Sequence, residues 1–281
     1  QSQFSRTELL LGQDALRTLS EKRVAVFGIG GVGGNAAEAL ADPDQVFATL
    51  DAVGEKKVDA AERRLAGISQ ELVVHKHCCF YLPEERGDID FSQFDYVVDA
   101  LDTVSAKIDI VLQAKRAGIP VISALGCGNR TDPSKLKVCD ISETSGDPLA
   151  RVVRRELRKR GVFSLKVVFS EELPVRPLGL DQIDSEGEKP RRKSPPGSTA
   201  FVPPVAGILI AHQVVMDLTS WTKEGRSMPS KQALEALEEE RKTFSKGKNG
   251  SDEARVEKTI EKTDNCYIMI LTSILYLISL S

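Results

Sequence analysis

The chain has 281 residues, a formal net charge of −3 and five cysteines. That length suffices for one large α/β domain or two small ones, and 41% apolar residues can supply a core. A charge this close to neutral excludes a uniformly basic surface, so any nucleic-acid site must be local. No Cys-x-x-Cys pair occurs, which excludes a zinc clamp built on such pairs.

The first 124 residues alternate between helix-like and strand-like segments. Leu9, Leu16 and Leu19 recur near helical spacing, which predicts an amphipathic helix over residues 4–20. Further helices are predicted over 35–41, 56–67 and 106–117, and buried strands over 23–28, 71–79, 94–99 and 119–124. This alternation predicts a Rossmann-like α/β fold, with a mostly parallel sheet and helices on both faces.

Beyond Pro148 the sequence becomes richer in basic, polar and charged segments. A strongly basic helix is predicted over 149–160, a strand over 165–170, a loop over 179–199 and an apolar helix over 201–219. Residues 221–265 are polar and charged, so an exposed helix or linker is expected there. We therefore predict one α/β domain over 1–220 and a polar tail with a short apolar end over 221–281.

The two ends of the chain bear on its location. The N-terminal residues Gln1 to Arg6 contain no apolar signal segment, so a cytoplasmic location is the default expectation. Residues 267–281 are almost all apolar or hydroxylated. Because a membrane span needs roughly 20 residues, a packed terminal helix or strand is expected there, with membrane association as the alternative.

Glycines are dense between the first buried strand and the following helix. Gly28, Gly30, Gly31 and Gly33 allow a tight turn and let phosphate oxygens approach the main chain. The helix that follows offers free N–H groups and a positive dipole end to an anion. The same glycines fit a nicotinamide-dinucleotide fingerprint, which expects a second strand ending in an acid about 20 residues on. Here the nearby acids follow the helix directly, at Asp42.

The glycine doublet and four further segments resemble the ThiF/MoeB family of adenylating enzymes, which has the ubiquitin-activating-enzyme-like fold. The segments are Phe4-Ser-Arg6, Asp42-Pro-Asp-Gln-Val46, Val53-Gly-Glu-Lys-Lys-Val58 and Asp99-Ala-Leu-Asp-Thr103. The resemblance implies ATP and Mg²⁺ as cofactors. It implies that Arg6 reaches ATP in a partner subunit, Asp42 the ribose, Lys57 the phosphates, and Asp102 with Thr103 the Mg-ATP.

The chemistry of these residue types agrees with those roles. Activating a carboxylate brings two anions together, so a cation such as Lys57 can offset the charge and Asp102 can hold Mg²⁺. Lys56 is the register alternative to Lys57, and either can be a plain surface lysine. Asp102 can instead cap the following helix, and the same alternative applies to Asp99.

Three later segments are similar to one branch of the family, the tRNA threonylcarbamoyladenosine dehydratases. They cover residues 126–144, 147–151 and 194–203. This likeness implies ATP-dependent cyclisation of threonylcarbamoyladenosine at position 37 of tRNA, through an adenylated carboxylate. It also implies a homodimer, with a monovalent cation and a sulfur-transfer protein as further candidates and no DNA partner. Activation of a sulfur-carrier or ubiquitin-like protein is the alternative.

Basic side chains over 151–160 form the best candidate for tRNA contact. Spacings of three and four residues place several of them on one helix face, which suits a phosphate backbone. A solvated helix face is the alternative. In the branch that these segments resemble, the ring closes within the substrate, so no enzyme cysteine is needed, and Cys127 and Cys139 are expected to be packing residues. His75, His77, Cys78 and Cys79 are expected on a strand rather than around a metal.

One departure from the family concerns the sheet. The family has a second strand before the Asp42 equivalent and an Asn-x-x-Arg-Gln segment after it. Here Ala41 runs directly into Asp42, and Val46 into Phe47. We therefore expect a sheet from which one strand is missing. Because a lost central strand leaves unpaired edges, an inactive, truncated relative is a further alternative.

Overall fold

The computed structural model describes residues 11–41, 56–69, 72–78, 81–83, 89–175, 197–222, 225–226 and 267–272. The α-helices are α2 (Gln13–Ser20), α3 (Gly33–Ala41), α4 (Lys57–Ile68), α5 (Val104–Ala117), α6 (Pro148–Lys159) and α7 (Val202–Thr219). The strands are β1 (Arg23–Phe27), β2 (Val73–Cys78), β3 (Tyr96–Asp99), β4 (Val121–Ala124), β5 (Leu136–Asp140), β6 (Lys166–Ser170), β7 (Trp221–Thr222), β8 (Gly225–Arg226) and β9 (Tyr267–Thr272). Short 3₁₀ turns are η2 (Phe91–Gln93), η3 (Pro133–Lys135) and η4 (Ile141–Glu143).

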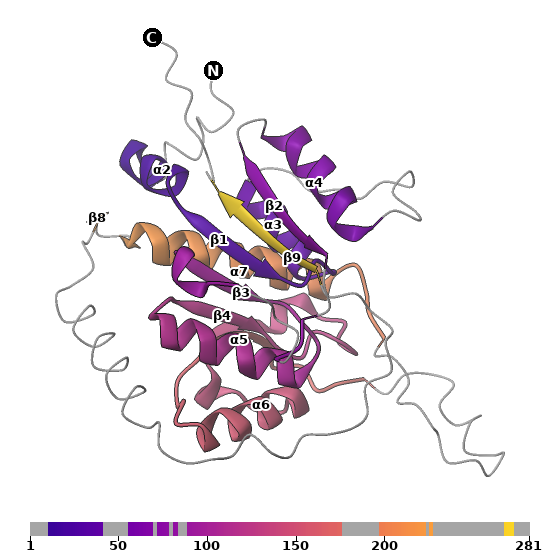
Figure 1. The fold of residues 1–281 in the computed structure, drawn as a ribbon. Coiled ribbons are helices and arrows are strands. Elements are labelled where there is room, and N and C mark those ends of the chain that lie inside the picture. The colour runs from indigo at the N-terminus through magenta and orange to yellow at the C-terminus, as the bar shows by residue number, and fades with distance from the viewer. Residues whose placement is uncertain are drawn as a thin grey trace, which may run out of the picture.

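A seven-stranded sheet forms the centre of the molecule, in the order β2-β9-β1-β3-β4-β6-β5 (Figure 1). β1, β3, β4 and β6 pair in parallel. β2 runs in the same direction, because it is antiparallel to β9, which is itself antiparallel to β1. Only β5 and β9 run the other way. The mostly parallel sheet predicted from the alternating pattern is therefore confirmed.

Helices cover both faces of this sheet. α2, α3, α4 and α7 contribute to one hydrophobic cluster, and α5 and α6 contribute to the other. Within β1, Val24 and Val26 belong to the first cluster, whereas Phe27 belongs to the second. This division follows from the alternation of side chains along a strand, and both faces are apolar because both are buried.

The place beside β1 is taken by a strand from the far end of the chain. β9 pairs with β1 from Arg23–Thr272 to Phe27–Ile268, and with β2 from Val73–Thr272 to Cys78–Tyr267. Residues 42–55, which follow the point where the family's second strand is missing from the sequence, lie outside the described ranges. The apolar C-terminal segment thus includes a packed strand, one of the two expected outcomes, and this strand lies inside the sheet.

Helix α7 is long and apolar enough to cross a membrane by length and composition alone. It lies instead over the sheet and packs closely on α3, where a side chain on Gly207 would collide with the Val32 carbonyl. Ala206, Ile210 and Val214 are buried in this contact region. We therefore describe α7 as a core helix of the domain.

Boundaries of the predicted elements shift by a few residues. Within the described residues the N-terminal helix runs over α2 only, after Gly12, whose φ of 80° lies in the left-handed region. Gly118 and Gly161 end α5 and α6 with φ of 73° and 78°, as glycines after a helix commonly do. Most of the predicted 179–199 loop and of the polar segment after Trp221 lies outside the described residues, apart from the β7–β8 pair.

Candidate functional site

The glycine loop joins β1 to α3 at the carboxyl edge of the sheet. Gly28 is buried with φ of 93°, and a side chain there would lie 2.8 Å from the Ala100 carbonyl oxygen. A side chain on Gly33 would collide with the Gly28 carbonyl. Both glycines are therefore required by backbone contacts, because this turn places β1, α3 and the end of β3 in direct contact.

The next two glycines have a different role. Gly30 and Gly31 are exposed. Among the described residues, apart from its chain neighbours, none has an atom within 4 Å of the position that a Gly30 side chain would occupy, whereas a Gly31 side chain would lie 3.2 Å from Pro203. α3 begins two residues after Gly31, so its N-terminal end follows this open backbone. An open glycine backbone before a helix N-terminus fits a phosphate group, as the sequence predicts.

Asp99 is a structural residue. It ends β3 and is completely buried, where its carboxylate accepts hydrogen bonds from Ser123 Oγ (2.5 Å) and Lys107 Nζ (3.1 Å). Lys107 also donates to the Ala124 carbonyl oxygen at 2.7 Å, so it joins α5 to β3 and β4. Asp99 is thereby fully engaged with the protein, which agrees with its lower rank among the predicted ligands.

Asp102 has the opposite character. It lies three residues beyond β3, is exposed, and receives no hydrogen bond or ion pair from any described residue. It does not cap α5, because the N-cap is Thr103, whose side chain makes no capping bond either. An exposed carboxylate beside a phosphate site suits Mg²⁺, which binds through one or two carboxylates and keeps several waters.

The other predicted residues are only partly placed. Lys57 is the first residue of α4 and Lys56 is its N-cap, and both side chains are exposed. No described contact joins Lys57 to the glycine loop or to Asp102. Arg6 and Asp42 lie outside the described residues.

The cysteines fit their predicted packing roles. Cys127 follows β4, donates to the Leu125 carbonyl oxygen at 3.4 Å, and has its pKa raised to about 11, chiefly by burial. Burial also raises the pKa of Cys139, with smaller contributions from Glu143 and Asp140. Neither thiol is a ready nucleophile, because the thiolate is the reactive form. His75 and His77 are exposed on β2, and no metal cluster occurs among the residues described above.

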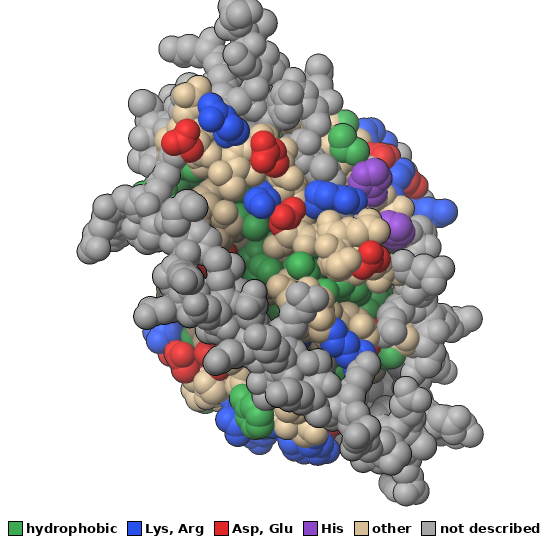
Figure 2. All heavy atoms as spheres, turned by 60° about the vertical axis from the view of Figure 1, so that its left-hand side comes forward, with side chains coloured by type: hydrophobic (Ala, Val, Ile, Leu, Met, Phe, Trp, Pro, Cys, Tyr) green, Lys and Arg blue, Asp and Glu red, His purple; other side chains and the backbone are tan. Residues whose placement is uncertain are grey.

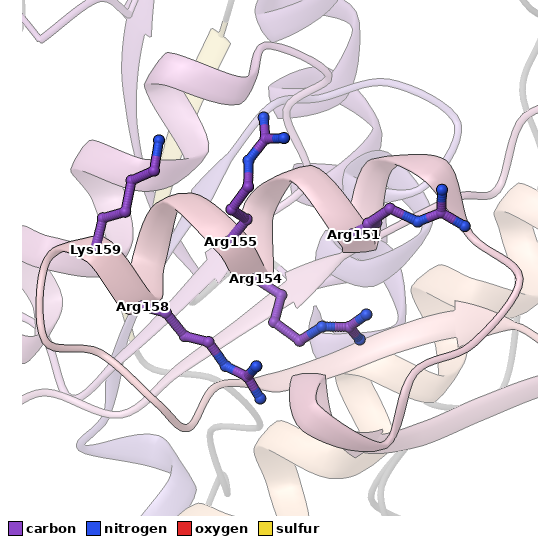
Figure 3. A pocket seen from close by; sticks show the side chains of 5 residues that line it. All are labelled: Arg151, Arg154, Arg155, Arg158 and Lys159. Atoms are coloured by element: carbon purple, nitrogen blue, oxygen red, sulfur yellow. The ribbon is translucent and has the colours of Figure 1, made fainter.

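Helix α6 displays the predicted basic face. Asp147 caps it, accepting from Leu149 N at 2.8 Å, and Ala150, Val153 and Leu157 are buried on its inner side. Its outer side borders an open pocket of about 500 Å³ lined by Arg151, Arg154, Arg155, Arg158 and Lys159 (Figure 3). Arg155 and Lys159 point to one side of the helix, and Arg154 and Arg158 to the other. In Figure 2, Lys and Arg side chains gather at the lower end of the molecule, where Figure 1 places α6.

These cations are not equivalent. Arg154 donates to the Ile141 carbonyl at 3.0 Å and to Thr144 at 2.6 and 2.9 Å, so it fixes the η4 turn to the helix. Lys159 and Arg160 pair with Glu156 at 2.9 and 3.0 Å, and hold the pKa of that carboxyl at about 2. No described residue accepts from Arg151 or Arg158. Within this helix the free cations therefore outnumber the acids.

Two buried charges were not predicted from the sequence. Arg130 and Asp147 are only 2% and 4% exposed, and each carries a polar atom without a hydrogen bond. The sequence indicates Asp147 only as part of one family-like segment and Arg130 only as part of another. The glycines on either side of Cys127 were the available signal, because they indicate a loop whose backbone must pack closely.

A parallel sheet with a glycine loop after β1 and a free carboxylate after the adjacent β3 defines a nucleotide-binding α/β protein. The chain belongs to the ThiF family, whose model matches residues 44–255. It is 41% identical over 239 residues to a Bacillus subtilis protein named tRNA threonylcarbamoyladenosine dehydratase, covering 77% of this chain and 94% of that relative. The Haemophilus influenzae protein of that name is 31% identical over 204 residues, covering 63% of this chain and 78% of the relative.

Solved structures give the same family. The Escherichia coli tRNA N6-threonylcarbamoyladenosine dehydratase in complex with AMP superposes with a TM-score of 0.63 at 27% identity, covering 78% of this chain and 94% of that one. The same enzyme in complex with ATP gives a TM-score of 0.62 at 26% identity, with the same coverage. The predicted family and the predicted fold are both confirmed by these matches.

Proposed function

We propose that this chain uses ATP to cyclise threonylcarbamoyladenosine at position 37 of tRNA, so that the nucleoside loses the elements of one water and ATP is converted to AMP and pyrophosphate. The observation that carries the proposal is the free Asp102 carboxylate at the sheet edge where the open Gly30 backbone lies. Membership of the ThiF family and the likeness to dehydratases over most of the chain support it. The raised pKa values of the half-buried thiols of Cys127 and Cys139 disfavour a covalent relay through either cysteine.

The proposed roles follow the electrostatics of the site. The glycine loop and the start of α3 hold the phosphates, and Asp102 holds Mg²⁺, which offsets phosphate charge when it is bound. Lys57 is proposed to reach the phosphates, and Thr103 to lie against the same nucleotide. Asp42 for the ribose, Arg6 crossing to the partner of a homodimer, and a monovalent cation rest on the family resemblance alone.

The proposed reaction balances in two steps. A substrate carboxylate oxygen attacks the α-phosphate of ATP, forming a P–O bond and releasing pyrophosphate. An atom of the same side chain then attacks the activated carbonyl and loses its proton, and the C–O bond to AMP breaks. One carboxylate oxygen leaves with AMP, so the nucleoside loses the mass of one water. The protein supplies positioning and charge stabilisation, because the nucleophile belongs to the substrate.

The outer face of α6 is the proposed docking surface for the tRNA backbone. Arg151, Arg155, Arg158 and Lys159 are exposed there, whereas Arg154 is engaged with the η4 turn. Phosphate contacts of this kind position a nucleic acid without reading its sequence. The domain division at residue 220, a cytoplasmic location and a sulfur-transfer partner also remain proposals.

Nucleoside mass spectrometry tests the reaction. Protein, ATP, Mg²⁺ and tRNA carrying threonylcarbamoyladenosine are incubated together, and the modified nucleoside is expected to lose one water only when ATP is present. A folded protein that binds ATP but leaves the nucleoside unchanged contradicts the proposal and favours activation of a carrier protein instead.

Charge removal on α6 tests the docking surface. The double variant Arg151→Gln and Arg158→Gln is expected to weaken tRNA binding and reduce the salt slope by about one per lost phosphate contact. The matched control, Arg17→Gln with Lys135→Gln, removes the same charge from exposed residues elsewhere in the described part of the chain. Equal loss of tRNA binding in both double variants contradicts a specific role for α6.

A further inference from the structure

Arg130 is a buried cation without a described partner. It follows the glycine-rich loop after β4, is 2% exposed, and its Nε makes no hydrogen bond. No described residue forms an ion pair with it. Glu172 is instead held by the backbone N–H groups of Thr131 and Asp132 at 2.9 Å each. A buried guanidinium in this condition is costly, because its Nε–H donor has been removed from water without gaining an acceptor.

Asp147 is the second unsatisfied charge in the same region. One of its oxygens caps α6, accepting from Leu149 N at 2.8 Å, whereas its Oδ2 is buried without any donor. That Oδ2 lies directly against Gly126, since a side chain on this glycine would collide with it. Gly126 therefore leaves the free carboxylate oxygen directly beneath the loop that follows β4.

Both charges act on Cys127, which connects them spatially. Arg130 lowers and Asp147 raises the pKa of this thiol, and Asp102 raises it as well. Residues 126–129 are only half-buried, so the loop between β4 and Arg130 is in contact with solvent. The cation at Lys107 is already satisfied by Asp99 and a carbonyl, which leaves Arg130 as the unpaired one.

The loop after β4 is fixed by hydrogen bonds between Asn129 and two residues distant in the sequence. Asn129 has φ of 57°, its side-chain oxygen accepts from Gly197 N at 2.6 Å, and its N–H donates to the Gly197 carbonyl at 2.7 Å. Val175 N donates to the Asn129 carbonyl at 2.8 Å. A non-glycine residue in the left-handed region that is fixed by three hydrogen bonds indicates a preorganised loop.

We propose that Arg130 and Asp147 form a recognition site for the group that is activated, a carboxylate with a nearby N–H or O–H donor. Arg130 pairs with the carboxylate before activation, and Asp147 Oδ2 accepts from the donor. The inference rests on the proposed function, because a threonylcarbamoyl side chain carries a carboxylate, a hydroxyl and ureido N–H groups. It adds substrate recognition to residues that the ATP site does not use.

The free protein and the substrate-bound protein differ in which polar atoms of Arg130 and Asp147 lack a hydrogen bond. A charge kept buried and unsatisfied destabilises the free protein, and a ligand that completes its hydrogen bonds recovers that loss on binding. The ligand must carry both the carboxylate and the donor. If one of them is missing, the Arg130 or Asp147 atom that it would have paired stays without a hydrogen bond. An analogue lacking one of the two groups is therefore rejected.

Arg130→Gln and Asp147→Asn test the site, with Arg154→Gln as a control that loses hydrogen bonds already made in the free protein. Asp147→Asn keeps an oxygen for the α6 cap. Arg130→Gln is expected to keep or raise the melting temperature, and to raise KM for modified tRNA about 10- to 100-fold with KM for ATP unchanged. Arg154→Gln is expected to lower the melting temperature. Arg130→Lys keeps the charge and should fall between wild type and Arg130→Gln.

Thermal shift with the free threonylcarbamoyladenosine nucleoside separates this inference from the proposed reaction. Stabilisation of the wild type that both Arg130→Gln and Asp147→Asn abolish supports the site, even if no dehydrated product forms. Equal stabilisation of wild type and variants overturns it. A fall in the melting temperature of Arg130→Gln with unchanged KM also overturns it, because Arg130 is then a structural residue. Absence of product in the wild type overturns the proposed reaction alone.

Discussion

Charged side chains at the amino ends of the parallel strands differ in their bonding from those at the carboxyl ends. The two ends are called the amino edge and the carboxyl edge of the sheet. At the amino edge, Asp95 accepts from Lys22 Nζ at 3.1 Å and from Arg23 N at 2.8 Å. Asp217 accepts from Tyr96 at 2.6 Å and pairs with Lys166 at the same distance. Burial and the Asp217 charge both raise the pKa of Tyr96. Each carboxylate at this edge connects two or more elements.

At the carboxyl edge, charges are left without protein partners. Asp102 is exposed and unbonded within the described residues, while Arg130 and Asp147 each keep a buried atom unsatisfied. Buried polar atoms without hydrogen bonds are rare in proteins and need an explanation. The difference indicates that the amino edge stabilises the fold, whereas the carboxyl edge is arranged for ligands.

The buried Lys107–Asp99 pair is an exception to this difference between the two edges. It lies at the carboxyl edge, yet both side chains are at most 1% exposed and bonded to each other. Lys107→Met leaves Asp99 as an uncompensated buried charge, so we expect the free energy of unfolding to fall by about 3–5 kcal/mol. Chemical denaturation measures this loss. A variant as stable as wild type contradicts the structural role.

Replacing one carboxylate by an amide at each edge tests the difference directly. Asp102→Asn is expected to lower the rate of dehydration at least about 100-fold, with the melting temperature unchanged, since only charge stabilisation of the reaction is removed.

Asp217→Asn is the matched variant at the amino edge. We expect it to lower the free energy of unfolding by about 1.5–3 kcal/mol and to keep full activity per folded molecule. Activity and denaturation measured on both variants decide the matter. Parallel effects in the two assays would show that the edges do not differ.

A substitution in strand β9 is expected to lower the free energy of unfolding by a smaller amount. Ile270 stands opposite Ala25 of β1 and His75 of β2. Ile270→Pro removes a backbone donor from the middle of the sheet, so we expect a loss of about 1–3 kcal/mol. Ile270→Val keeps the donor and is the control. If both variants melt like the wild type, β9 does not complete the sheet in solution.

The smallest effect is expected at Cys127. Because burial raises the pKa of its thiol to about 11, little thiolate forms at pH 8 and alkylation by iodoacetamide should be slow in the folded protein. Cys127→Ser should change the dehydration rate by less than about threefold, within the range of a packing residue. A loss of 100-fold would make Cys127 part of the chemistry.

Much of the fold was predictable because periodicity and glycines act locally. Alternating apolar runs placed β1, β3, β4 and β6, and Gly118 and Gly161 marked two helix ends. The choice of Asp102 over Asp99 came from the family resemblance. That choice stays a prediction. Spacing could not reveal that Asp99 is buried against Lys107, because that contact joins α5 to β3.

The sequence by itself determined the elements, the glycine loop and the charge of α6, since each depends on residues a few positions apart. The tertiary structure alone decided that β9 lies between β1 and β2, because these strand pairings join segments from opposite ends of the chain, such as Phe27 with Ile268. It also decided which charges find partners. Asp95 and Asp217 are satisfied by distant elements, whereas Arg130 and Asp147 each keep a buried polar atom without a hydrogen bond.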